Sequence, residues 1–272
     1  MWAETTMSNP NLPAELLDHI VDHLHDTEDA LINCCLVSKS WIPRTRKHLF
    51  ADVWFEAKED LESWKETFPD PSTSPGRYTN TLIIDCPHVV TAADAEAGGW
   101  IRDFSHVVHL KLDGRPGPHH GYESEIFLVP LQGFSPFVKS LKIYCIALPI
   151  SRIFGLILSF PLLEDLTAGN CSEVTINEDD GSDGLPTIFQ PLNPPVFTGS
   201  LRLTMTGLAS IGRRLLSLPG GIHFRKFRST WDRGEDIPLV AALVERCSHT
   251  LESLDIGCDP LGASIRRLRP YR

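Results

Sequence analysis

Long apolar runs are missing from this chain of 272 residues. The longest, residues 153–160, spans eight residues, whereas a membrane-spanning helix needs about twenty. The start of the sequence, MWAETTMSNPN, is polar and has neither the positively charged segment nor the apolar core of a signal peptide. We therefore expect no membrane partner and a cytoplasmic or nuclear location.

Cysteine is present but is not arranged in pairs. The seven cysteines are an odd number and no C-x-x-C spacing occurs, so neither a disulfide framework nor a zinc site is expected. Cys145, Cys171 and Cys258 each follow the start of a short apolar strand-like segment by a few residues. That position favours packing in a core over a reactive thiol.

Basic residues are too few and too scattered to predict a nucleic-acid-binding surface. The chain has 25 Lys and Arg against 35 Asp and Glu, a formal net charge of −10, whereas nucleic-acid binders carry a basic stripe. The basic clusters are short and lie at 44–47, 225–228 and 266–269. In the middle cluster, Arg225, Lys226 and Arg228 suit either contact with a phosphate group or a solvated face.

Catalytic and metal-binding motifs are also scarce. The G-x-S-x-G, H-E-x-x-H, P-loop and G-x-G-x-x-G patterns are all absent. His119 and His120 lack a third metal ligand, and residues 179–190 match a calcium loop only in part because Gln190 stands where a bidentate carboxylate is required. We expect no catalytic residue, metal or cofactor, with an α/β enzyme that has an unrecognised site as one alternative.

The stretch at residues 12–50 has apolar side chains at helical spacing. Pro13 suits the start of a first helix, and Pro43 suits the first turn of a third helix capped by Ser40. A unit of about forty residues rarely buries enough apolar surface to be stable alone. Its apolar side chains therefore pack either on the rest of the chain or on a partner. Those on the first helical face are Leu12, Leu16, Leu17, Ile20, Val21 and Leu24.

The order of motifs in this stretch resembles the F-box. It consists of L-P-x-E-L-L-x-x-I at 12–20, then Leu24 and Leu31, then L-V-S-K-x-W at 36–41 and L-F at 49–50. The resemblance implies a helical trio that docks onto a Skp-type adaptor and, through it, onto a cullin in a ubiquitin ligase. The docking residues that it implies are Leu12, Pro13, Leu16, Ile20, Leu24, Leu31, Leu36, Val37 and Trp41.

The character of the sequence changes after residue 56. Residues 58–66 predict an exposed helix with charge pairs at i,i+3 and i,i+4, and residues 68–77 are rich in Pro and Ser, as is typical of a linker. We therefore expect an F-box helical domain at 8–56, a helix and linker at 57–77, and a substrate-binding domain at 78–272.

A weak repeat follows the expected linker. Short L-x-L-like segments recur at intervals of 25 to 35 residues, with a last interval of 53 in which Phe227 supplies a further strand. Apolar, helix-compatible stretches at 150–160 and 239–247 precede two of these segments. The segments lie at 82–84, 110–112, 141–143, 166–168, 201–203 and 254–256.

This cadence resembles irregular leucine-rich repeats, and the whole chain resembles fungal F-box proteins with a degenerate leucine-rich-repeat-like C-terminal region. The predicted fold class is α/β, with an F-box helical trio followed by an irregular solenoid of parallel strands and helices. Strands with two inward apolar residues bury nothing alone and must stack. An ordinary α/β domain with βαβ spacing is the alternative. The outward residues predicted to form a substrate face are Lys111, Lys142, Arg202 and Asp255.

Together these features predict a non-enzymatic adaptor. The F-box would hold a Skp-type adaptor while the repeat region holds an unknown substrate protein near a ubiquitin-conjugating enzyme, so that raised effective concentration accelerates transfer. A Skp-bound scaffold without a role in degradation is the other alternative. After the last strand, the basic tail predicts either a minimal helix at 264–269 or a chain truncated before a terminal cap.

Overall fold

The computed structural model divides the chain into two compact units, Met1–Asp52 and Val53–Arg272. It describes residues 13–85, 99–114, 134, 136–148, 150–173, 195–204, 208–231 and 236–258. The pair His119 and His120, the residues at 179–190 and the tail at 264–269 lie outside these ranges. The division falls four residues before the boundary expected at residue 56, and the assignment of functions to the two units remains a proposal.

The first unit consists of three short helices, α1 (Ala14–His23), α2 (Glu28–Val37) and α3 (Ile42–Leu49). Pro43 lies in the first turn of α3, as expected, because its missing N–H needs no partner there. The expected cap at Ser40 is wrong: Trp41 occupies the N-cap position and makes no side-chain cap bond. The Ser40 hydroxyl instead lies 2.9 Å from that of Ser38.

The core of this unit is small. Among its described residues, the buried apolar side chains are Val21, Leu31 and Cys34, and Thr45 is buried as well. The Thr45 hydroxyl is satisfied because it donates to the Trp41 carbonyl at 2.7 Å. A core of this size leaves most of the unit's apolar side chains at its surface.

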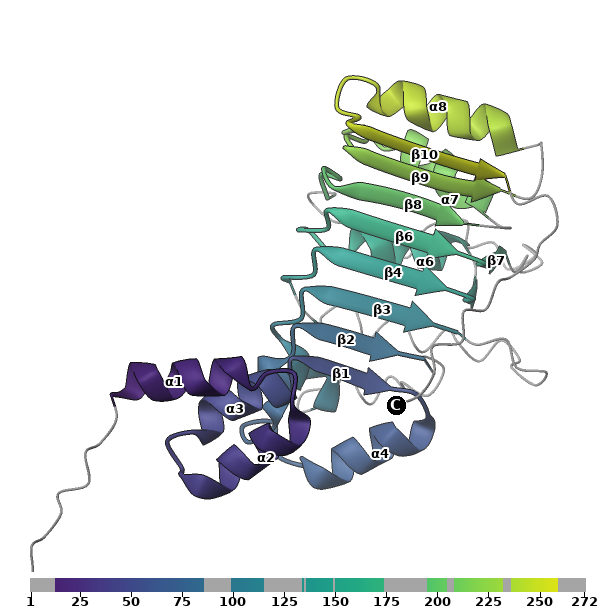
Figure 1. Ribbon diagram of the computed structural model, residues 1–272. Helices are drawn as coiled ribbons and strands as arrows, with labels where there is room; N and C mark the ends of the chain where they lie inside the picture. Colours follow the sequence, from purple (N-terminus) through teal and green to yellow (C-terminus); the bar gives the residue numbers. More distant parts are fainter. Residues whose placement is uncertain are drawn as a thin grey trace, which may run out of the picture. The chain divides into compact units, whose positions relative to one another are not determined.

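The second unit is built on an eight-stranded sheet in the order β1-β2-β3-β4-β6-β8-β9-β10, so that each strand lies beside its predecessor in the chain (Figure 1). Every segment predicted from the repeat, including that around Phe227, forms one of its parallel strands. Short β5 (Ala147–Leu148) and β7 (Ser172–Glu173) form a separate pair. The sheet strands are β1 (Asp52–Phe55), β2 (Thr81–Ile84), β3 (His109–Asp113), β4 (Ser140–Tyr144), β6 (Asp165–Gly169), β8 (Ser200–Thr204), β9 (Lys226–Trp231) and β10 (Ser253–Cys258).

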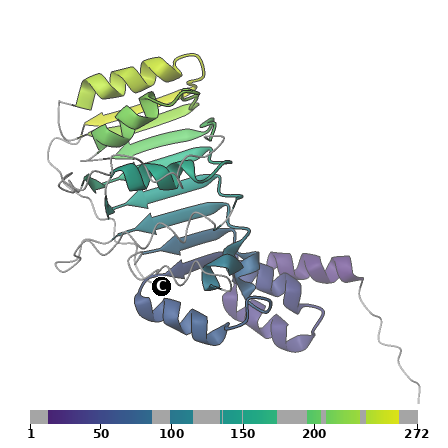
Figure 2. The same cartoon turned by 180° about the vertical axis from the view of Figure 1, so that it is seen from behind.

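Alternation along the strands separates two faces of the sheet. In β3, Leu110 and Leu112 are buried while Lys111 between them is not, and β4 and β8 repeat the pattern. Helices α6 and α7 lie on the buried face, which is in front in Figure 2 and behind the strands in Figure 1. The α-helices of this unit are α4 (Lys58–Thr67), α6 (Ile150–Leu158), α7 (Leu208–Leu216) and α8 (Ile237–Cys247), with 3-10 turns η1 (Pro75–Tyr78) and η4 (Trp100–Phe104).

Helix α4 belongs to the core of the second unit. Its Leu61 and Trp64 are buried, so the expectation of an exposed helix holds only for its charged side, where Lys65 and Glu62 pair at 3.3 Å. The Trp64 ring lies 5.7 Å from that of Phe55 and 5.2 Å from that of Phe104. These edge and tilted contacts between rings are favourable beyond simple burial, and they tie the helix that precedes the expected linker into the fold.

The turns that follow two adjacent strands repeat the same backbone conformation. Cys145 and Asn170 both have positive φ, at 53° and 54°, and the Asn170 amide donates to the Cys145 sulfur at 3.4 Å. Next to them, Cys171 is buried and donates to the Gly169 carbonyl. Burial raises the pKa of the Cys171 thiol to about 11, so the reactive thiolate is scarce. Cys171 is thus a core residue, as expected from its place after a strand.

Candidate functional site

Two apolar stripes lie on the surface of the first unit. On α1, Leu16 and Ile20 are one helical turn apart and both are exposed. On α2, Ile32 and Leu36 have the same spacing, and Val37 follows. Leu36 is 82% exposed and Val37 is 68% exposed, values that a core residue does not have. Such side chains mark a surface that another molecule can cover.

The residues that the F-box resemblance implies for docking do not share one environment. Leu16, Ile20, Leu36 and Val37 are exposed, together with Pro13 just before α1. Leu24 and Trp41 are half-buried, Leu31 is only 1% exposed, and Leu12 lies outside the described residues. Sequence reasoning missed Ile32, although its i,i+4 spacing to Leu36 was a usable signal.

A charged clamp fixes α1 against α3 and thereby holds the first stripe in place. The Asp22 carboxylate accepts two hydrogen bonds from the Arg44 guanidinium and one from His48 Nε2 at 2.7 Å. The fork of the guanidinium matches both carboxylate oxygens, which fixes the orientation of the two helices. These bonds hold the pKa of Asp22 well below its usual range, so the carboxylate stays ionised at neutral pH.

The second candidate surface is the face of the sheet opposite α6 and α7, here called the open face (Figure 1). Strand register places the predicted Lys111, Lys142, Arg202 and Asp255 in one row across it. The same row contains Ile83, Thr167 and Arg228, which sequence reasoning did not assign to this face. Whether the row contacts a substrate stays a prediction.

Charges along this row are not balanced. Lys111 pairs with Asp113 at 3.1 Å and with Asp85 at 3.7 Å, and Arg228 pairs with Asp255 at 3.0 Å. Lys142 and Arg202 are exposed and form no ion pair with the residues that the structure describes. Over the part of the chain that the structure describes, these two cations in the middle of the open face therefore lack a compensating acid.

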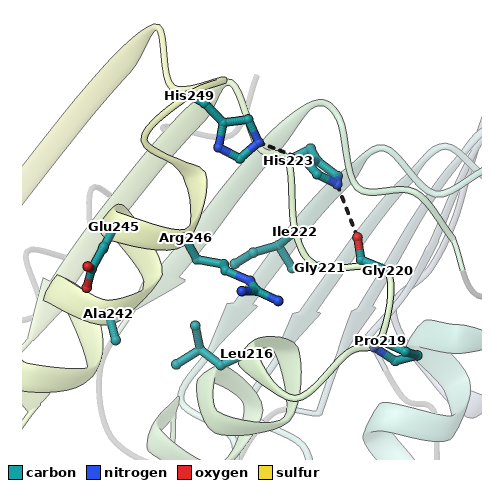
Figure 3. Close-up of a pocket in the computed structure, with 10 residues that line it drawn as sticks. All are labelled: Leu216, Pro219, Gly220, Gly221, Ile222, His223, Ala242, Glu245, Arg246 and His249. Carbon is teal, nitrogen blue, oxygen red and sulfur yellow. Dashed lines mark hydrogen bonds between the residues drawn. The ribbon is translucent and has the colours of Figure 1, made fainter.

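A cavity of about 520 Å³ lies elsewhere in the second unit, between the end of α7 and α8 (Figure 3). His223 Nδ1 lies 3.3 Å from His249 Nε2, and the other nitrogen of His223 lies 3.1 Å from the Gly220 carbonyl. The Glu245 carboxylate points away from both imidazoles (Figure 3). The lining residues are Leu216, Pro219, Gly220, Gly221, Ile222, His223, Ala242, Glu245, Arg246 and His249.

The cavity can be compared with the site that an enzyme would need. An α/β enzyme requires converging acids or histidines beside a nucleophile or a second acid. The cavity lining contains the histidine pair but no Ser, Thr, Cys or Asp. Among the described residues, no group of three His, Cys, Asp or Glu side chains is placed to hold a metal ion.

Over the described residues, no helix combines the length and apolar character needed to cross a bilayer. Residues 10–42 match the family model of the F-box domain. The match covers α1, α2 and the first residue of α3, including both apolar stripes. The chain therefore contains an F-box domain at these residues. No curated protein matches the sequence.

F-box domains generally bind Skp-type adaptors and, through them, cullin complexes. The domain thus supports a general role in substrate recognition by ubiquitin ligases of this kind. F-box proteins are typically non-catalytic adaptors that work in the cytoplasm or nucleus. The matched residues all lie within the first unit.

Proposed function

We propose that this protein is a substrate-recognition subunit of a Skp–cullin–F-box ubiquitin ligase. Its three-helix unit would dock onto the Skp-type adaptor, and its sheet unit would hold a substrate protein near the ubiquitin-conjugating enzyme. One observation carries the proposal: the residues that match the F-box domain are those whose apolar side chains, Leu36 and Val37 above all, are left in water.

Burial of these side chains provides the driving force for docking. Removing apolar surface from water yields about 25 cal/mol per Å², and full burial of one Leu or Ile side chain contributes about 1.5–3 kcal/mol. Interfaces concentrate their binding energy in a few such anchors. Leu16 and Ile20 on α1 and Leu36 on α2 are suited to be anchors because each is exposed on a helix that is already formed.

The remaining docking residues take supporting roles in this proposal. Leu31 is buried and holds α2 on the unit's core, so its side chain acts through the position of Leu36. Leu24 and Trp41 are half-buried and border the docking surface, while Pro13 and Leu12 begin the motif. Residues that contact the adaptor directly are thus distinct from those that maintain the helices.

The sheet unit would supply recognition. The strands stack in the order in which they occur in the chain, and successive strands are about one repeat apart in sequence. This order supports the resemblance to degenerate leucine-rich repeats. The open face, with Lys111, Lys142, Arg202 and Asp255 in one row, is the proposed substrate surface. Holding the substrate there raises its effective concentration at the conjugating enzyme, and this chain performs no chemistry itself.

Co-purification with a Skp-type adaptor tests the docking step. The full-length chain is expected to retain the adaptor, and the variant Leu16→Asp/Leu36→Asp is expected to lose it while its far-UV circular dichroism stays unchanged. The matched control, Leu162→Asp/Val196→Asp, alters two exposed apolar residues of the other unit and is expected to bind normally. Equal binding by wild type and both variants would contradict the proposed docking surface.

The role in degradation needs a separate measurement. The purified complex is expected to contain a cullin and to transfer ubiquitin to proteins that co-purify with the sheet unit. A complex that contains the adaptor without cullin would instead favour a Skp-bound scaffold that acts outside degradation.

A further inference from the structure

An aromatic ring lies on the open face where three neighbouring strands end. Register places Tyr144 of β4, Gly169 of β6 and Thr204 of β8 side by side. A Cβ atom added at Gly169 would lie 2.9 Å from Tyr144 Cδ1 and 2.3 Å from the Thr204 hydroxyl. The Tyr144 ring therefore occupies the space that a side chain at position 169 would fill.

One cation lies over this ring, and two more project on the same face of the sheet. The Lys111 ammonium lies 5.9 Å from the ring centroid, within the range of a cation–π contact. Lys142 lies two residues before Tyr144 on the same strand, and Arg202 lies two residues before Thr204, so both project on the same face. Tyr144, Lys142 and Arg202 are here called the cationic platform.

The electrostatics of the platform differ from those of the whole chain. The chain carries a formal net charge of −10, yet Lys142 and Arg202 have no acidic partner among the described residues. The neighbouring cations Lys111 and Arg228, by contrast, are already paired with aspartates. A partner that covers the platform must supply negative charge, because desolvating two unpaired cations is otherwise costly.

We propose that the cationic platform binds an extended, acidic segment of the substrate protein, with its carboxylate or phosphate groups on Lys142 and Arg202 and its backbone or an apolar side chain on the Tyr144 ring. This inference rests on the proposed function and names its substrate class. Arginine suits the site because its planar fork matches both kinds of anion.

The length of the segment follows from strand spacing. The row from Lys111 on β3 to Arg228 on β9 spans four strand-to-strand steps. At about 4.8 Å per step the row measures about 19 Å, which about six extended residues cover. An acidic residue at every second or third position of such a segment would face the two unpaired cations.

Fluorescence anisotropy with three labelled peptides tests the proposal on the full-length protein. Each peptide has about ten residues, enough to span the row. In the first peptide, glutamate alternates with serine. In the second, phosphoserine replaces each glutamate, and in the third, lysine replaces each glutamate. The glutamate peptide, the phosphoserine peptide or both are expected to bind, and their relative affinity identifies the source of the negative charge. Binding should weaken as salt is raised.

Variants locate the binding site. Lys142→Glu/Arg202→Glu is expected to weaken binding of the acidic peptides about tenfold or more. Lys58→Glu/Arg213→Glu changes the net charge equally at two exposed helical residues and is expected to leave binding unchanged. Tyr144→Ala keeps the charge and is expected to weaken binding about fivefold.

Several results would overturn the proposal. One is that the lysine peptide binds as tightly as the acidic peptides, and another is that no acidic peptide binds. A third is that the Lys58/Arg213 variant loses as much affinity as the Lys142/Arg202 variant. A fourth is that a uridine oligonucleotide binds more tightly than the acidic peptides, which would indicate a nucleic-acid surface. Adaptor co-purification on the same preparation separates this inference from the proposed function. A protein that retains the adaptor but binds no acidic peptide contradicts the inference alone.

Discussion

The three-helix unit and the sheet unit distribute their apolar side chains in opposite ways. In the first, the exposed set of Leu16, Ile20, Ile32, Leu36 and Val37 outnumbers the buried set of Val21, Leu31 and Cys34. In the second, one buried residue per strand aligns across the sheet, from Leu82 on β2 to Phe227 on β9. The first unit leaves apolar surface for a partner, whereas the second uses its apolar surface to fold.

The polar side chains complete the contrast. In the first unit, the Asp22–Arg44–His48 clamp holds α1 against α3, whereas in a larger unit a buried core would hold the helices together. In the second, charged residues stand on the open face, where Lys142 and Arg202 contribute little to folding. Burial dominates the stability of large units, and small units depend more on specific polar contacts or on partners.

The largest effect is expected from the core of the sheet unit. Phe104 is fully buried and its ring contacts those of Phe55, Trp64 and Trp100. Phe104→Ala should lower the free energy of unfolding by about 3–5 kcal/mol because it leaves a cavity among rigid rings. Urea denaturation followed by tryptophan fluorescence measures this loss, and a change below about 1 kcal/mol would show that the cluster is not a core.

A substitution in the smaller core of the three-helix unit should destabilise that unit alone. Leu31→Ala is expected to destabilise the three-helix unit by about 2–3 kcal/mol and to reduce adaptor binding, while the sheet unit keeps its unfolding midpoint. Hydrogen exchange resolved by segment distinguishes the two units. Faster exchange in the sheet strands as well would mean that the units do not unfold independently.

The clamp offers a test by pH. The folded-state pKa of Asp22 is lowered, so its contribution is fully present above the ordinary carboxyl range of about 4 and is lost as pH falls through the folded value. Asp22→Asn should speed amide exchange in α1 and α3 at neutral pH and remove this acid dependence. Glu15→Gln on the same helix is the control, and an identical acid response in wild type and Asp22→Asn would contradict the account.

The smallest effect is expected at the surface of the sheet unit. Lys139 and Glu164 pair at 3.0 Å, but both side chains are about half exposed. Solvent screens such a pair, so Lys139→Ala should change the free energy of unfolding by less than about 1 kcal/mol. A larger loss in thermal denaturation would indicate that surface charge contributes more to this unit than its core pattern suggests.

The sequence predicted the strands well because alternation is a local signal. An L-x-L segment fixes which residues are buried, so Lys111, Lys142 and Arg202 were assigned to one face before any register was known. Arg228 was missed because only Phe227 identified its strand. The strand β1 was missed as well, since a single D-V-W-F segment has no neighbour in the repeat.

The errors arise where tertiary contacts decide the outcome. Helix α4 has only Leu61 and Trp64 at core spacing, and their burial depends on the rings of Phe55 and Phe104, which are distant in sequence. On α2, apolar residues occur around the whole helix, so the pattern could not separate buried Leu31 from exposed Leu36. The Asp22–Arg44 clamp joins residues 22 positions apart and leaves no local signal.

Hydrogen exchange of the full-length chain with and without a Skp-type adaptor tests the central claim most directly. The account predicts that the adaptor slows exchange around Leu16–Ile20 on α1 and Ile32–Val37 on α2, while strands β3, β4 and β8 exchange at unchanged rates. Unchanged exchange in both helices, or protection confined to the sheet, would contradict the assignment of docking to the three-helix unit.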